Sequence, residues 1–405
     1  QLEPNDAWAY LILGNLYFHH DHDLGSADRY FGTAIDLAPN DPYILTSYAG
    51  VKAQRGNYAE ARPLFERAIA QDSTYPNPRY NLAICQSREG DTEGALETLE
   101  SLLLTPESDD RRHQPVYVEA RKLYLELQRQ VAEARHPRNL ELLRESMAAY
   151  TAQTGYPIKL EQDATLKTAA TAQLAWVHQR PHHVIKYKET DRASLAHLIA
   201  HELEHILLHT EAHEAGKEKN YTTNRTTEQY ARRVLDKEVR KLTRTGLDAS
   251  TFDRYIGQLI TGLANQLFNA PLDLIIDSRV YTKYPFLHTS QFVSMNGLQA
   301  EGLKALTSPD LRNLSPRTIY QANIAMNCAY ALFIDNLFEG VTNYAAPYRN
   351  SGMFSTGQQL LAQWEQTMVH FQPGDEYTLV DAFAQLLNLK NWYEWRSPAS
   401  QTAPT

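Results

Sequence analysis

The chain has 405 residues, of which 43% are hydrophobic, and its formal net charge at pH 7 is −9. This length and composition are sufficient for two or three domains and exclude a largely disordered chain. The negative charge argues against nucleic acid as a partner, because phosphate binding requires a basic surface. The two cysteines, Cys85 and Cys328, argue against a disulfide framework and fit a reducing compartment.

Targeting and membrane signals are not expected in this sequence. No stretch approaches the roughly 18 consecutive apolar residues typical of a transmembrane helix. Residues 1–6 are polar and lack the basic and apolar regions of an export signal. Together with the cysteine content, these features predict a cytoplasmic protein with no membrane partner.

The N-terminal quarter contains an internal repeat. Ala27, Ala61 and Ala95 recur at a spacing of 34 residues (27 to 61, and 61 to 95). Further small or apolar residues follow four and seven positions after each of them: Phe31, Phe65 and Leu99, then Ala34, Ala68 and Leu102. Turn signals recur at residues 56–58 and 90–92. Small residues at fixed helical positions let two antiparallel helices approach closely, and the larger residue fills the groove of the neighbouring repeat.

This pattern resembles the tetratricopeptide repeat over residues 5–105. The match includes Leu13, Gly14, Tyr17 and Pro39. The resemblance implies an α-solenoid over residues 1–106, whose surface binds peptides or partner proteins. Residues 2–6 are similar to residues 37–41, which close the first repeat, and this predicts a further repeat upstream. A purely scaffolding or dimerising role is the alternative.

A different pattern follows the repeats. A polar link at residues 107–110 precedes helical periodicity from about residue 116 to residue 150. We expect a break or kink at His136-Pro137, because proline removes a helix hydrogen bond. Residues 107–150 are therefore predicted to be connecting helices.

The next region has mixed character. Residues 182–188 alternate between apolar and polar side chains and follow Pro181, which predicts a short strand. Residues 171–176 are ambiguous between helix and strand. Asp191 is a suitable N-cap for the helix that is predicted to follow.

This predicted helix contains the sequence His-Glu-Leu-Glu-His at residues 201–205. Residues four apart on a helix share one face, so His201 and His205 can bind one metal ion. Zinc binds neutral imidazole nitrogens, and a catalytic zinc site leaves one position for water. Glu202 lies beside the first ligand, where its carboxylate can take a proton from that water. The segment therefore predicts a zinc-dependent hydrolase.

A third protein ligand is required. A metzincin-like site would need glycine and histidine at the positions held by Leu208 and Glu211, so that class is disfavoured. Downstream, Asp273 and Asp277 are four residues apart among apolar residues and would share one helix face. Buried carboxylates on such a helix need a cation or hydrogen bonds.

Together these motifs resemble the zincin superfamily of peptidases over residues 180–290, and in particular the gluzincin arrangement of the thermolysin-like enzymes. The resemblance implies that Asp273 is the third zinc ligand and that Asp277 orients a ligand histidine from the outer shell. The gluzincin ligand is glutamate, so the shorter aspartate requires a closer helix. The strand ahead of the motif helix would pair with extended substrate. The alternative is that both aspartates pair with Arg279 or Lys283.

Other side chains near the motif are weaker candidates. His197, His209 and His213 continue the four-residue spacing, but such a row drifts around the helix axis, so we predict ordinary surface histidines. His182 and His183, on the predicted strand, could contact substrate. Candidate donors to a developing oxyanion follow the second acidic motif: Tyr281, Tyr284 and His288.

The remainder of the chain, from about residue 227, is predicted to be almost wholly helical. Breaks are expected near Gly246, Pro285, Pro309 and Pro316. Residues 321–338 are apolar enough for a buried helix, and residues 373–375 begin a last helical unit. The predicted fold is mainly α, with a zincin-like α+β catalytic domain and a small sheet at residues 151–290 and a helical C-terminal region at residues 291–405.

The sequence thus predicts a zinc metallopeptidase that acts on proteins or peptides. His201, His205 and Asp273 would bind Zn²⁺. Glu202 would be the general base and Asp277 the outer-shell partner, while the repeats recruit a substrate or a regulator. The alternative is a tetratricopeptide adaptor with a structural or inactive zincin domain, against which the intact Glu202 argues. An amide hydrolase of the deformylase type is disfavoured, because neither cysteine lies near the motif.

Overall fold

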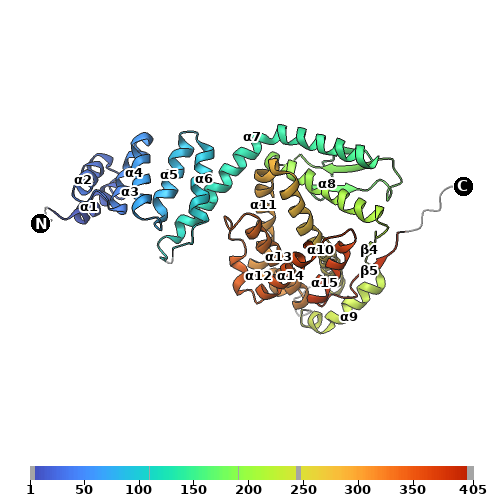
Figure 1. Ribbon diagram of the computed structural model, residues 1–405. Coiled ribbons are helices and arrows are strands. Elements are labelled where there is room, and N and C mark those ends of the chain that lie inside the picture. The colour runs from blue at the N-terminus through green and yellow to red at the C-terminus, as the bar shows by residue number, and fades with distance from the viewer. Residues whose placement is uncertain (1–4, 109, 190, 243–247, 399–405) are drawn as a thin grey trace. The chain divides into compact units, whose positions relative to one another are not determined.

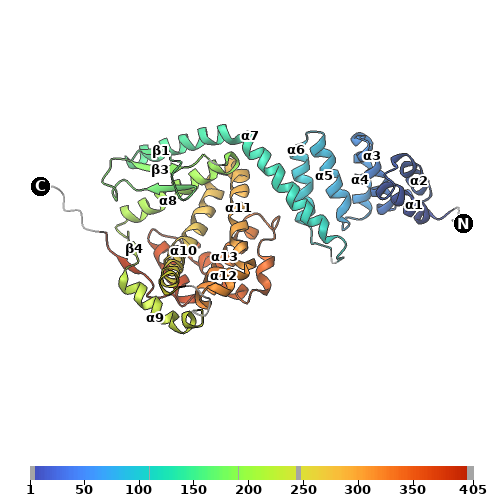
Figure 2. The same ribbon diagram turned by 180° about the vertical axis from the view of Figure 1, so that it is seen from behind.

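The computed structural model describes residues 5–108, 110–189, 191–242 and 248–398. The chain divides into two compact units, which Figures 1 and 2 show from opposite sides. Unit 1 comprises residues 1–128 and 339–342, and unit 2 comprises residues 129–338 and 343–405. Three features of the sequence lie outside the described residues: Gly246, where a break is predicted, Asp109 of the polar link, and residues 2–4 of the segment that predicts an upstream repeat.

Unit 1 begins with helices that pack in consecutive pairs, α1 with α2, α3 with α4 and α5 with α6. Their bounds are α1 (Ala7–His19), α2 (Leu24–Leu37), α3 (Pro42–Gln54), α4 (Tyr58–Gln71), α5 (Pro76–Arg88) and α6 (Thr92–Leu103). Most begin at an aspartate, such as Asp23 or Asp41, whose side chain accepts hydrogen bonds from backbone amides of the first turn. Figure 1 shows these pairs side by side in blue to teal.

The repeat predicted from the sequence is confirmed in unit 1. Ala27, Phe31 and Ala34 are buried, as are their counterparts in the following pairs. Gly14 faces the Phe31 ring so closely that an added Cβ would lie 2.4 Å from it. Gly56 adopts a φ of +81° in the turn before α4, a conformation that favours glycine.

Helix α7 (Gln114–Thr154) is continuous, although Pro137 lies inside it. The helix therefore does not break at this proline, and the kink that the sequence also allowed there stays a prediction. An internal proline costs a helix roughly 3 kcal/mol. Buried side chains on both sides of it, including Ala132 and Leu143, hold the two halves of the helix in place.

A three-stranded sheet precedes the motif helix in unit 2. Its strands are β1 (Ile158–Gln162), β2 (Ala170–Gln173) and β3 (His183–Tyr187), in the order β1-β3-β2. β3 pairs parallel with β1 and antiparallel with β2. The strand predicted at residues 182–188 is thus present as β3. It is the central strand, however, so the prediction that it pairs with substrate is wrong. The two edge strands are β1 and β2.

Helix α8 (Arg192–Glu214) contains the motif and packs against β2, β3, α10 and α11. Asp191 caps it, as predicted, by accepting a hydrogen bond from the amide of Ala193. Its apolar side chains, among them Ile199 and Leu203, share one core with Ile275 of α10 (Ala249–Lys283). This packing places the acidic face of α10 opposite the motif.

The C-terminal helices complete the same core, so residues 291–338 and 343–398 are not separate from it. The remaining elements are β4 (Asn220–Thr222), α9 (Arg225–Leu242), η2 (Pro285–Leu287), α11 (His288–Thr307), α12 (Pro309–Leu314), α13 (Arg317–Leu337), η3 (Ala346–Asn350), α14 (Phe354–Met368), α15 (Asp375–Leu386) and β5 (Glu394–Arg396). The predicted interruptions at Pro285, Pro309 and Pro316 fall between helices, and α13 is the predicted buried helix. Strand β5, which pairs antiparallel with β4, is a short exception in a region that is predicted to be almost wholly helical.

Helix α10 is long and apolar enough, over Ser250–Lys283, to cross a membrane by length and composition alone. Half of its most apolar window is buried inside the structure. Core helices of globular domains meet the same criterion, and the buried carboxylate of Asp277 lies on this helix. The expectation of no membrane span stays a prediction.

Candidate metal centre and its cavity

Three potential metal ligands converge between α8 and α10. The Oδ1 atom of Asp273 lies 3.5 Å from Nε2 of His201 and 3.9 Å from Nε2 of His205. One donor atom from each side chain can be chosen so that all lie within 4.8 Å of one another. Donor atoms of a tetrahedral zinc site, each roughly 2.0–2.2 Å from the ion, lie about 3.4 Å apart. The three residues therefore fit one zinc ion, and the aspartate is near enough to reach it.

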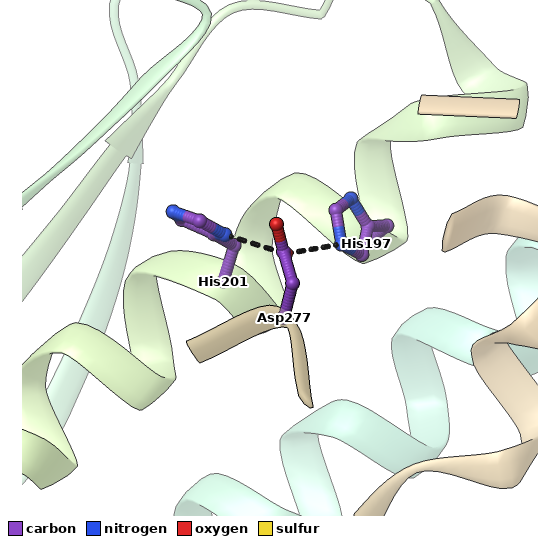
Figure 3. Close-up of side chains that lie close together, drawn as sticks. All are labelled: His197, His201 and Asp277. Carbon is purple, nitrogen blue, oxygen red and sulfur yellow. Dashed lines mark hydrogen bonds and ion pairs between the residues drawn. The ribbon is translucent and has the colours of Figure 1, made fainter. Parts of the chain in front are cut away.

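Asp277 lies behind this group and is fully buried. Figure 3 shows its carboxylate between the imidazoles of His197 and His201, with α10 facing α8. Its Oδ1 atom is 3.0 Å from Nδ1 of His201 and 3.2 Å from Nε2 of His197. The hydroxyl of Tyr330 donates to Oδ2 at 2.5 Å. Asp277 is thus held by three side chains and directs the other nitrogen of His201 toward Asp273.

Burial and charge shape the pKa values of this cluster. Burial raises the pKa of Asp273, even though hydrogen bonding and charge from His201 oppose the shift. Burial also acts to raise the pKa of Asp277, but the charge of His201 and hydrogen bonds from His197 and His201 hold it well below the usual range. Burial lowers the pKa of His205 well below its usual value. A buried carboxylate that is disfavoured as an anion, beside a neutral imidazole, is a donor set that a cation would stabilise.

Glu202 points into the same cavity from α8. Burial raises its pKa, while the charge of His201 and a hydrogen bond from the backbone amide of Ala172 in β2 act in the opposite direction. A carboxylate whose pKa moves toward neutrality is a better general base near pH 7. Glu202 thus lines the same cavity as His201, His205 and Asp273.

The cavity has a volume of about 870 Å³. The metal-ligand candidates and Glu202 form one part of its lining, and residues 168–172, which include the start of β2, form another. Within the described part of the chain, β2 pairs only with β3. Its second edge is therefore not paired with another strand, and two of the backbone groups of β2 have side-chain partners instead: the amide of Ala172 donates to Glu202, and the carbonyl of Ala170 accepts from Thr168.

The prediction of surface histidines along α8 is wrong for the residues that flank the motif. His197 is 1% exposed and bonds to Asp277, and His209 lines the cavity. His213, at the end of the helix, stacks on Trp176 with ring centroids 4.3 Å apart. His197, His209 and His213 do lie at different angles around the helix axis. Other elements of unit 2 pack on several sides of α8, so these histidines contact protein.

Other candidates lie away from the cavity. His183, the first residue of β3, is fully buried, and its Nδ1 accepts a hydrogen bond from the backbone amide of Ala175. The prediction that it contacts substrate is therefore wrong. His182 does not line the cavity either. Tyr281 stacks on His288, with ring centroids 4.1 Å apart, and Tyr284 donates to Glu204. The oxyanion role is therefore not supported for these three residues.

The alternative pairing of the two aspartates is also not observed. Arg279 pairs with Glu211 at 2.8 Å, and Lys283 pairs with Glu204 at 2.8 Å. Glu204, inside the motif, is fully buried and also accepts a hydrogen bond from Tyr284. These contacts are further links between α8 and α10, which also carry the candidate metal ligands.

Sequence reasoning missed Tyr330 and the amides of Gln266 and Asn327, all of which line the cavity. The sequence of α13 contains a pattern that could have indicated two of these residues. Asn323, Asn327 and Tyr330 are four and three residues apart on a helix with many buried apolar residues, so they share one polar stripe. Such a stripe on a core helix indicates a polar contact or a cavity.

Similarity to a known protein family is found within unit 1. The tetratricopeptide repeat family model matches residues 52–115. No curated protein matches the chain. The TPR2B domain of yeast Sti1 in its pHsp70 complex is 23% identical, over 31% of this chain and 97% of that chain, with a TM-score of 0.28. The TPR domain of P58(IPK) is 13% identical, over 95% of this chain and 98% of that chain, with a TM-score of 0.29. The family match ends at residue 115, so the metal centre lies outside it.

Proposed function

We propose that the chain is a zinc-dependent peptidase whose tetratricopeptide repeats recruit a protein substrate or regulator. The observation that supports this most directly is the convergence of His201, His205 and Asp273, with Glu202 beside them, in one cavity next to an edge strand. A structural metal site would be closed, whereas this group faces a cavity large enough for a peptide segment.

His201, His205 and Asp273 would hold the ion. When bound, zinc would lower the pKa of a water molecule and draw electron density from the carbonyl group of the substrate. Asp277 accepts the Nδ1 proton of His201, which leaves Nε2 of that ring free to act as a ligand. Tyr330 and His197 hold Asp277 in turn, so the outer shell is rigid.

Glu202 carries the proton transfers in this proposal. Its carboxylate takes a proton from water as the oxygen attacks the peptide carbonyl, and it then gives that proton to the leaving nitrogen. The carbon–nitrogen bond breaks, and an amine and a carboxylate form. The free edge of β2 would align the substrate backbone beside this carboxylate, because residues of β2 and Glu202 line the same cavity.

The repeats suggest a role in protein interaction, which also favours a second candidate function. In that case the chain is an adaptor and its second unit has no turnover. The intact Glu202 favours the peptidase, since an adaptor has no use for a general base in this place.

The test combines metal content with hydrolysis. Purified wild type should contain about one zinc per chain by mass spectrometry, which also distinguishes zinc from iron bound to the same two histidines and carboxylate. Glu202→Gln should keep the metal and lose hydrolysis of an unfolded protein by about 10²-fold or more. Glu214→Gln, at an exposed position on the same helix, is the matched control and should keep both.

Zinc-loaded wild type that cleaves no unfolded protein or peptide would overturn the peptidase. Full hydrolysis in Glu202→Gln would instead overturn the role of that residue. Wild type without bound metal, after zinc is supplied, would favour the adaptor.

A further inference from the structure

Part of the cavity wall, away from the metal centre, carries three side-chain amides from two helices. Gln266 lies on α10, and Asn323 and Asn327 lie one turn apart on α13. Nε2 of Gln266 donates to Asn327 at 3.1 Å, and Nδ2 of Asn327 donates to Asn323 at 3.1 Å. Nδ2 of Asn323 donates back to Gln266 at 2.7 Å. The three amides form a closed hydrogen-bonded ring, the carboxamide ring.

The ring leaves hydrogen-bonding capacity unused. Each primary amide has two N–H donors and two acceptor lone pairs, and the ring uses one donor and one acceptor of each. The second N–H of Asn327 has a long contact of 3.5 Å to the carbonyl of Gly302. Each of the three side chains is only partly buried. The ring can therefore both donate to and accept from a ligand group without opening.

The ring faces space on two sides. Gln266 and Asn327 line the 870 Å³ cavity that contains the metal centre. Gln266 and Asn323 line a second cavity of about 300 Å³. No lysine or arginine lines the larger cavity, among the residues that the structure describes, and its carboxylates, Glu202 and Asp273, belong to the metal centre. Apolar side chains, among them Leu298 and Met326, line the same cavity, and Asn269 and Tyr330 add uncharged polar groups to its lining.

We infer that the carboxamide ring is a specificity-determining subsite that takes an uncharged, hydrogen-bonding side chain of the substrate, such as asparagine, glutamine, serine or threonine. This inference rests on the proposed peptidase function. A carboxamide or hydroxyl can donate and accept at once, which matches the groups that the ring leaves free. A charged side chain would lose its water and meet no opposite charge in this wall, which is unfavourable.

The position of the ring limits which substrate residue it contacts. Gln266 precedes Asp273 by seven residues on α10, two turns of the helix, or about 10 Å along its axis. An extended peptide advances about 3.3 Å per residue. The ring therefore contacts a side chain within about three residues of the bond that is cleaved.

The test uses the full-length, zinc-loaded protein and a library of peptides, blocked at both ends, in which each position is varied in turn. We expect one position within three residues of the cleaved bond to prefer glutamine, asparagine, serine or threonine over lysine and glutamate by about tenfold or more. No preference at any of these positions would overturn the inference while leaving the peptidase intact.

Variants of the ring make the test specific. Asn327→Asp keeps the shape of the side chain and adds one negative charge, so it should shift the preference at that position toward lysine and arginine by about tenfold. Gln266→Glu adds the same charge from the other helix and should act in the same direction. Asn265→Asp, on the exposed side of α10 next to Gln266, is the control and should not change the preference. Melting temperatures show whether Asn327→Asp or Gln266→Glu fails to fold. If one of them does, the substrate preference of the other variant tests the inference.

A binding assay separates the inference from the function on which it rests. The same peptides are captured on Glu202→Gln and on Glu202→Gln/Asn327→Asp. Mass spectrometry then identifies the bound peptides and the residue that each carries at the varied position. Enrichment of uncharged polar residues on the first protein, replaced by basic residues on the second, supports the ring even if no hydrolysis is found. Identical enrichment on the two proteins overturns it.

Discussion

His201 and Asp277 are joined through the Nδ1 atom of the imidazole, which lies 3.0 Å from the carboxylate. This contact assigns a different task to each ring nitrogen, because the opposite atom, Nε2, then faces Asp273. The candidate metal site would therefore depend on the two aspartates of α10 in different ways. One is a candidate ligand, and the other sets the orientation of a ligand.

This difference predicts unequal effects of removing the two aspartates. Asp273→Ala should lose the bound metal, because it removes one of three protein ligands. Asp277→Asn should keep the metal but weaken its affinity by about 10–100-fold, because it perturbs an outer-shell partner. Competition with a chelator of known affinity, read by mass spectrometry, measures both.

Asp253→Asn, near the start of the same helix, is a suitable control, because Asp253 is exposed and pairs with Arg232 instead. A full equivalent of metal with unchanged affinity in Asp273→Ala would show that this residue is not a ligand.

Glu204 should contribute to stability rather than to turnover. It is fully buried and contacts Lys283 and Tyr284 at 2.8 Å each. Glu204→Gln should lower the free energy of unfolding by about 1–3 kcal/mol, because buried partners lose a charged acceptor. Glu211→Gln removes a more exposed partner of Arg279 and should cost about 0–1 kcal/mol. Urea unfolding measures both, and a larger loss in Glu211→Gln would contradict this assignment.

The packing of the repeat helices predicts that alanine substitutions at Gly14 and Gly32 change the free energy of unfolding in opposite directions. Gly14→Ala places a Cβ 2.4 Å from the Phe31 ring and should destabilise unit 1 by about 1–3 kcal/mol. Gly32→Ala adds a methyl group where no atom lies within 4 Å, inside α2, and should stabilise the helix by about 0.5–1 kcal/mol. Thermal unfolding followed by circular dichroism compares them. Equal effects would mean that the close approach of α1 and α2 does not constrain Gly14.

The helical repeats and the relation of His201 to His205 could be predicted from the sequence because both are local. A spacing of four residues places two side chains on one helix face whatever surrounds the helix. A period of 34 residues with small residues at fixed positions specifies how consecutive helices pack. The role of Asp273 as a candidate ligand could also be predicted from the sequence, but only because its motif resembles a known arrangement.

Contacts between elements distant in the chain required the tertiary structure. The burial of His197 and the bond from Tyr330 to Asp277 depend on how α8, α10 and α13 pack, and no local spacing encodes that packing. The position of β2 at an edge of the sheet also required the tertiary structure, because the order in which strands pair is a long-range property. The continuity of α7 through Pro137 required it as well, because buried side chains on both sides of the proline outweigh its tendency to end a helix. The sequence by itself determined which helix carries the candidate chemistry, and the tertiary structure decided which side chains surround it, because side chains far apart in the sequence meet only when the helices that carry them pack.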